Sequence, residues 1–70
     1  MSQEFKAGDH VAWGKAEDRT WGRIKRKLTE PYKIKSFEVP ASHDNPYHLV
    51  ETDRTGAEAA HRPDELRKVN

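Results

Sequence analysis

Trp21-Gly22-Arg23-Ile24-Lys25-Arg26-Lys27-Leu28 decides the fold of this 70-residue chain. Side chains along a strand alternate between two faces, so Ile24 and Leu28 are expected to share one face with Gly22. The opposite face is then expected to carry Trp21, Arg23, Lys25 and Lys27. A glycine inside a strand marks a sharp bend or a close backbone approach. Because a small barrel needs such a bend in its long second strand, the stretch predicts a curled sheet.

Short alternating segments lie on both sides of this stretch, separated by Gly, Pro, Asn and Asp, whereas helical periodicity is nearly absent. This pattern is typical of a small barrel or sandwich. The expected strands are residues 9–14, 21–28, 33–41, 47–52 and 57–61, with 68–69 closing the sheet. A tight turn is expected at 53–56, and one helical or 3-10 turn at 62–66 with Pro63 at its first position. The sequence therefore predicts an all-β fold with the strands of a small barrel or sandwich.

The chain has the length of one domain, expected to span residues 1–70 with residues 1–4 disordered. Its large apolar side chains fill one thin core, expected to consist of Val11, Trp13, Ile24, Leu28, Phe37, Val39, Val50, Ala59 and Leu66. Along 47–52, either Tyr47 and Leu49 or His48 and Val50 face this core. There is no cysteine, no signal-peptide pattern and no apolar run of membrane-spanning length, so a soluble cytoplasmic protein without membrane contact is expected.

One ordered set of short motifs extends over nearly the whole chain. It comprises Gly8-Asp9-x-Val11-x-Trp13 preceded by Phe5-Lys6, then Gly22-Arg23-Ile24, Val39-x-Ala41-Ser42, Asn45-Pro46, Asp53-Arg54-Thr55-Gly56, Ala59-Ala60-His61-Arg62-Pro63 and Leu66. This set resembles the hypervirulence-associated Tudor-like domain family, previously listed as a domain of unknown function. The resemblance implies an all-β, five-stranded SH3/Tudor-like barrel that serves as a binding module. It implies no particular ligand, because fold analogy does not deliver function.

Positive charge is concentrated in the middle of the chain. Residues 19–35 hold seven basic residues against one acid, Glu30, although the whole chain has a net charge of only +1. An exposed indole beside cations is typical of a nucleic-acid platform, where bases stack on the ring and cations follow the phosphates. The expected nucleic-acid site consists of Trp21, Arg23, Lys25, Arg26, Lys27, Lys33 and Lys35. The alternative interpretation is that the lysine stems cover Trp21 and the cations only solvate an edge strand.

A second binding hypothesis uses the aromatic residues. SH3-like barrels bind extended peptides in aromatic grooves or at sheet edges, and Tudor-like barrels hold methylated residues in aromatic cages. An aromatic rim of Trp13, Trp21 and Tyr47 is the alternative peptide- or protein-binding site. The sequence leaves the choice of partner and the oligomeric state open.

Metal binding and catalysis have weak support. The four histidines, His10, His43, His48 and His61, have no metal-ligand spacing, so no metal or cofactor is expected. Ser42, His43 and Asp44 are triad-type residues, but their adjacent positions on a loop do not form a hydrogen-bonded series of nucleophile, base and acid. Ser42 and Asp44 are better interpreted as turn formers. The sequence therefore predicts a non-catalytic binding module.

Overall fold

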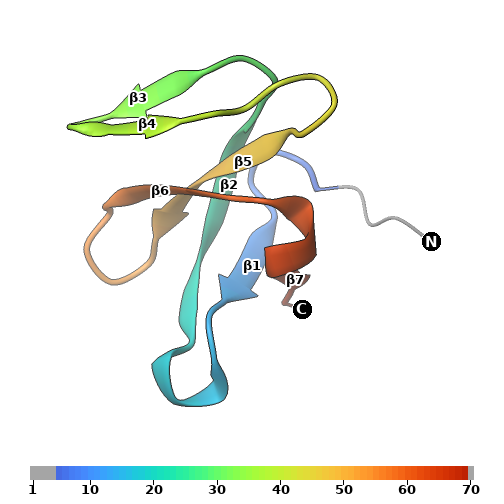
Figure 1. Ribbon diagram of the computed structural model, residues 1–70. Coiled ribbons are helices and arrows are strands. Elements are labelled where there is room, and N and C mark those ends of the chain that lie inside the picture. Colours follow the sequence, from blue (N-terminus) through green and yellow to red (C-terminus); the bar gives the residue numbers. More distant parts are fainter. Residues whose placement is uncertain (1–4, 70) are drawn as a thin grey trace.

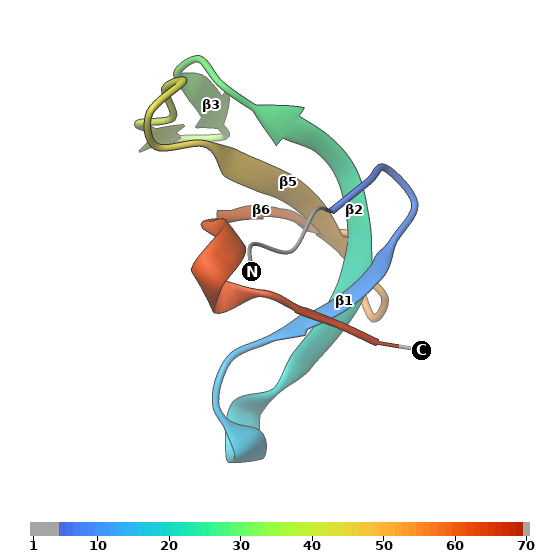
Figure 2. The ribbon, with the colours of Figure 1, turned by 90° about the vertical axis from the view of Figure 1, so that its right-hand side faces the viewer.

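A long strand, β2, forms the spine of the molecule, and it bends along its length as the alternating stretch around Gly22 predicts (Figures 1 and 2). The computed structural model describes residues 5–69, so the expected disorder of residues 1–4 lies outside the described residues. The described elements are β1 (His10–Trp13), η1 (Ala16–Asp18), β2 (Thr20–Leu28), β3 (Tyr32–Ile34), β4 (Phe37–Val39), β5 (Tyr47–Thr52), β6 (Glu58–His61), η2 (Pro63–Glu65) and β7 (Arg67–Lys68). All the strands pair antiparallel with their neighbours, and the predicted all-β class is confirmed.

The main sheet is curved but open. Its strand order is β6-β5-β2-β1-β7, and β3 pairs only with β4 in a separate hairpin. Within residues 5–69, no pairing joins β6 to β7, so the sheet does not close and the predicted five-stranded barrel is not confirmed. The 3-10 turn η2 connects these two edge strands (Figure 2).

Gly22 lies where two other groups approach the backbone closely. A Cβ atom built on Gly22 would lie 2.7 Å from Cη2 of Trp13 and would also collide with the carbonyl oxygen of Glu51. Val11 and Trp13 are two residues apart on β1 and therefore share a face of the sheet. Because Val11 pairs with Gly22, Trp13 and Gly22 point to the same side. The expected close approach at Gly22 is therefore confirmed, with the Trp13 indole as the approaching group.

A bulge at Lys25 changes the faces of β2. Ile24 pairs with Val50, but the next aligned pair is Arg26 with Leu49, so Lys25 is the extra residue. After the bulge, Leu28 pairs with Tyr47 and Lys27 with His48. Ile24 and Leu28 therefore lie on opposite faces, and the prediction that they share one face is wrong. Lys27 likewise leaves the face that carries Trp21 and Arg23.

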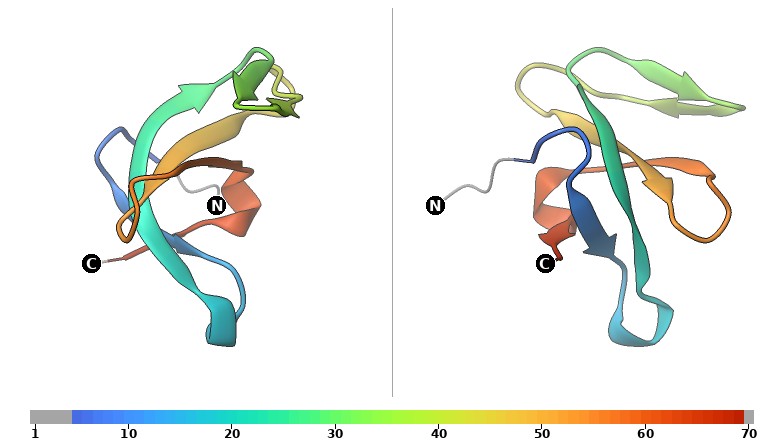
Figure 3. Two further views of the ribbon diagram at one scale, coloured as in Figure 1. Left: turned by 90° about the vertical axis from the view of Figure 1, so that its left-hand side faces the viewer. Right: turned by 180° about the vertical axis from the view of Figure 1, so that it is seen from behind.

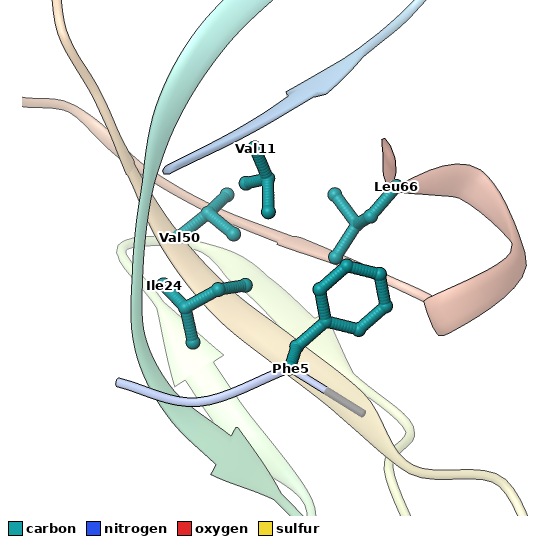
Figure 4. Packing of buried hydrophobic residues seen from close by; sticks show 5 residues of the cluster. All are labelled: Phe5, Val11, Ile24, Val50 and Leu66. Carbon is teal, nitrogen blue, oxygen red and sulfur yellow. The ribbon is translucent and has the colours of Figure 1, made fainter. Parts of the chain in front are cut away.

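Both faces of β5 are buried. On the inner face, Phe5, Val11, Ile24, Val50 and Leu66 point toward one another, with Trp13 and Ala59 packed at the border (Figure 4). On the outer face, a second cluster consists of Leu28, Val39, Ala41 and Leu49, against which Tyr32, Ile34, Tyr47 and Ala60 pack. The hairpin β3–β4 covers this outer face, whereas η2 lies on the inner side (Figure 3). The sequence analysis expected one face of 47–52 to be buried, but both faces are, because His48, Leu49 and Val50 are all buried.

The predicted strand 33–41 is two strands. A turn at Lys35 and Ser36 separates β3 from β4, and Phe37, expected in the core, is 61% exposed. The other expected core residues are buried or packed against a cluster, and the sequence interpretation missed Phe5, Ala12 and Ala41. The turn was missed because neither Lys35 nor Ser36 is a glycine, asparagine or aspartate, the residues that mark two-residue hairpin turns.

The C-terminal third of the chain agrees with the sequence. The 53–56 turn joins β5 to β6, with Gly56 at a φ of 74° and its N–H donating to the carbonyl of Thr52 over 2.9 Å. Pro63 opens the predicted 3-10 turn, whose Glu65 side chain accepts a hydrogen bond from the Arg62 N–H at 2.8 Å. These two turns fix where β6 begins and ends.

Candidate functional site

Trp21 lies on the outer face, and it is 44% exposed. Ala12 pairs with Trp21 on one side and with Arg67 on the other, so these three side chains form a row across β2, β1 and β7. Ala12 is buried between its two larger neighbours although it lies on the outer face. The structure thus adds Arg67 to the surroundings of the indole. No local sequence pattern marks this neighbour, because residues 21 and 67 meet only through the strand register.

The surroundings of Trp21 are not uniformly basic. Arg23 lies on the same face, and its Nη1 donates to the Gly8 carbonyl over 3.3 Å. Asp53 is held opposite Trp21 by a hydrogen bond from the Asp53 N–H to the Trp21 carbonyl. The Asp53 carboxylate lies 2.8 Å from Nε2 of His10. An acid–histidine pair therefore borders the indole.

Lys25 is neutralised by two acids. Its Nζ lies 2.8 Å from the carboxylate of Glu58 and 3.6 Å from that of Glu51. The hydrogen bond and negative charge of Glu58 raise the pKa of Lys25, and Glu51 adds to the effect. These acids come from β6 and β5, so the sequence around residue 25 does not disclose them. Lys25 therefore keeps its positive charge, but the two carboxylates compensate it and leave it less available to a phosphate.

The other four expected cations lie away from the indole. Arg26 covers the ring of Tyr32, with its guanidinium carbon 5.0 Å from the ring centroid. Lys27 faces the His48 side of the sheet, and Lys33 and Lys35 belong to the β3–β4 hairpin. Five residues of strand separate Trp21 from Arg26, a distance of about 17 Å. The structure therefore does not bring the seven predicted residues together on one surface.

The alternative aromatic rim is not assembled either. Trp13 lies on the inner face, with its ring centroid 5.0 Å from that of His61. Trp21 lies on the outer face of the neighbouring strand, and Tyr47 packs against the second cluster beneath the hairpin. Trp13 is therefore on the opposite face from Trp21 and Tyr47, and Tyr47 pairs with Leu28, at the far end of β2 from Trp21, so the three rings do not form one cage.

The free edge of β6 is a feature that the sequence interpretation missed. The Thr52 N–H donates to the Ala57 carbonyl over 2.9 Å, which makes residues 52 and 57 a hydrogen-bonded pair. Bonded and non-bonded pairs alternate along an antiparallel ladder. Glu58, opposite Glu51, and Ala60, opposite Leu49, are then non-bonded, so their N–H and C=O groups point away from β5. In the described chain, no turn or loop backbone group bonds to them.

The comparisons with known proteins agree with this architecture. The model of the hypervirulence associated proteins Tudor domain matches residues 8–66, which is most of the chain. The chain belongs to this family. Neither the comparison with curated proteins nor the comparison with solved structures gives a match. Membership supports a small Tudor-like binding module in general, because Tudor domains generally bind proteins or nucleic acids.

Two histidines of this Tudor domain, His48 and His61, lie on the inner face, where His48 is buried and His61 is half-buried. His48 is 4% exposed, its Nδ1 is buried with no hydrogen-bond partner among the described residues, and its ring meets the Phe5 ring edge-on at 5.2 Å. Burial and the charge of Lys27 lower the pKa of His48. Burial also lowers the pKa of His61, although Glu65 opposes the shift. Over residues 5–69, no group of three or more metal-binding side chains is found.

The serine–histidine–aspartate tripeptide of the Tudor domain lies in a turn. The Asn45 N–H donates to Oγ of Ser42 over 3.1 Å, and the Ser42 N–H donates to the Asn45 carbonyl at the same distance. The predicted turn-forming role of Ser42 is therefore confirmed.

Among the described elements, no helix has the length and apolarity needed to cross a membrane.

Proposed function

We propose that this Tudor domain is a protein-interaction module that binds an extended peptide by adding it as a strand to β6. The observation that carries the proposal is the outward-facing backbone of Glu58 and Ala60, which offers two N–H donors and two C=O acceptors in strand geometry. A peptide strand satisfies such groups directly, whereas a nucleic acid has no backbone that continues a β-ladder.

The two edges of the sheet differ in a way that favours β6. Proteins usually protect an exposed edge with charged side chains, prolines or very short strands. The β7 edge is only two residues long and consists of Arg67 and Lys68. The β6 edge is four residues long and carries Ala59 and Ala60, and its one acid, Glu58, is held by Lys25. The β6 edge is therefore the less protected of the two.

The variant Ala60→Pro tests this proposal. The Ala60 N–H makes no bond within the sheet, so proline removes the outward donor and leaves the β5–β6 ladder intact. The probes are short soluble peptides in which valine alternates with glutamate, glutamine or lysine. Loss of one backbone bond predicts roughly tenfold weaker binding of any peptide that binds the native domain. The control Ala60→Ser keeps the N–H and should bind like the native domain, whereas equal binding by Ala60→Pro contradicts the proposal.

Nucleic-acid binding is the second candidate, and the row of Trp21, Ala12 and Arg67 favours it. An exposed indole with Arg67 and Arg23 on the same face suits base stacking and phosphate contact. Trp21→Ala should then weaken the binding of a single-stranded oligonucleotide by about 1–3 kcal/mol. Phe37→Ala is the matched control, since it removes an exposed ring from the opposite end of the structure. An equal effect of the two substitutions removes Trp21 from the site.

A further inference from the structure

A groove opens at the first residue of β6. Its volume is about 470 Å³. Its lining comes from the end of β3 and the turn after it (Lys33, Ile34 and Lys35) and from the segment that leads into β6 (Thr55, Gly56, Ala57 and Glu58). This volume lies within the usual range of ligand sites. Glu58 belongs both to the groove and to the free edge, so the groove and the edge adjoin each other.

The backbone of Lys35 is strained at this groove. Its φ of 53° makes it the one non-glycine residue with positive φ among the described residues. A left-handed conformation is costly for a lysine, and glycine or asparagine adopts it with less strain. The two-residue turn between β3 and β4 calls for this positive φ, and a lysine rather than a glycine occupies the position. Lys35 thereby brings its ammonium group to the groove.

The charges at the groove favour an acidic ligand. Lys33 and Lys35 form no ion pair with any described residue, whereas the acid of the groove, Glu58, is bonded to Lys25. An apolar surface lies beside these cations, because Ile34 lines the groove and its cross-strand partner Phe37 is highly exposed. An occupant with both carboxylates and apolar side chains complements this surface.

We infer that the groove selects an acidic peptide segment in which carboxylates alternate with apolar residues, with Lys33 and Lys35 contacting the carboxylates. The inference rests on the proposed strand addition at β6 and names its ligand class. The free backbone groups of Glu58 and Ala60 favour a peptide over a nucleic acid, and the two free lysines favour an acidic peptide over a basic one.

The experiment compares the valine–glutamate, valine–glutamine and valine–lysine peptides by following amide NMR shifts of residues 33–35 and 55–60. The valine–glutamate peptide should bind most tightly. Lys35→Asn removes the charge and suits a positive φ, so it should weaken that peptide by about two- to fivefold without lowering the melting temperature. The matched control, Arg54→Ala, removes a cation from the β5–β6 turn outside the groove lining and should change the affinity less.

Each outcome separates the inference from the proposed function. Equal affinity for all three peptides, with shifts at Glu58 and Ala60, overturns the acidic preference and leaves strand addition standing. No shift with any peptide overturns strand addition itself. A single-stranded oligonucleotide that shifts the groove amides more than the acidic peptide does overturns the inference in favour of a nucleic-acid groove. Lys35→Asn with a lower melting temperature and unchanged affinity makes the lysine structural, which also overturns it.

Discussion

The indole of Trp13 lies over the Cα of Gly22, in the space that any side chain at residue 22 would need. A Cβ there would be 2.7 Å from the ring, and the carbonyl oxygen of Glu51 closes the other direction. This contact lets the long β2 strand bend around the inner core. It also explains why residue 22 is a glycine although it lies inside a strand.

Gly22→Ala should therefore destabilise the domain by about 2–4 kcal/mol, because both the indole and a backbone carbonyl would have to move. Urea unfolding measures the effect. Gly56→Ala is the matched control: nothing lies within 4 Å of its Cβ position, so only the positive φ is penalised, at a cost of about 1 kcal/mol. Similar losses for the two variants would contradict the close approach at Gly22.

The second cluster predicts that two residues of β4, Val39 and Phe37, contribute very differently to the free energy of unfolding. Val39 is fully buried beneath the hairpin, so Val39→Ala should cost about 1–3 kcal/mol. Phe37 is largely exposed, so Phe37→Ala should change the free energy of unfolding by less than about 0.5 kcal/mol. Chemical denaturation of both variants checks this contrast, and a larger loss for Phe37→Ala would contradict the hairpin register.

Stability should fall as the pH is lowered from about 7 to 5. Folding lowers the pKa of His48 and His61, so both bind protons more weakly in the folded state than in the unfolded state. The stabilisation is complete above the ordinary histidine pKa of about 6.5 and is lost as the pH falls toward the folded pKa values. Each site contributes at most about 1.4 kcal/mol per pH unit. Urea unfolding of His48→Leu should show a shallower pH dependence, and an unchanged slope would rule out His48 as a source.

Arg23 and Lys25 should differ in their effect on oligonucleotide binding, if the outer face binds nucleic acid. Glu58 and Glu51 neutralise Lys25, whereas Arg23 has no ion pair with any residue in 5–69. Arg23→Ala should weaken binding and reduce its salt dependence by about one phosphate contact, and Lys25→Ala should change it less. Fluorescence anisotropy at several salt concentrations measures both. A larger effect of Lys25→Ala would contradict the neutralisation.

Local side-chain patterns were sufficient for much of the fold. Alternation around Gly22 identified β2, the glycine at residue 56 identified the β5–β6 turn, and Pro63 identified η2. The prediction failed at two features that no residue type marks, a turn and a bulge. The turn at Lys35 contains no glycine, and the bulge at Lys25 depends on the register with β5, so the faces of Leu28 and Lys27 were assigned wrongly.

The candidate site was less predictable than the fold. Alternation placed Trp21 on an exposed face, as the structure has it. The partners that decide the local charge come from elsewhere in the chain: Glu51 and Glu58 reach Lys25, and Arg67 joins the row of Trp21. The free edge of β6 follows from the strand order, which no local pattern contains.

Amide hydrogen exchange along β6 tests the central proposal most directly, because it needs no substitution. In the free domain, Glu58 and Ala60 should exchange fast, and Ala59 and His61, bonded to β5, should exchange slowly. Saturation with the valine–glutamate peptide should slow Glu58 and Ala60 and leave Ala59 and His61 nearly unchanged. Fast exchange at Glu58 and Ala60 in the saturated complex would contradict strand addition at this edge.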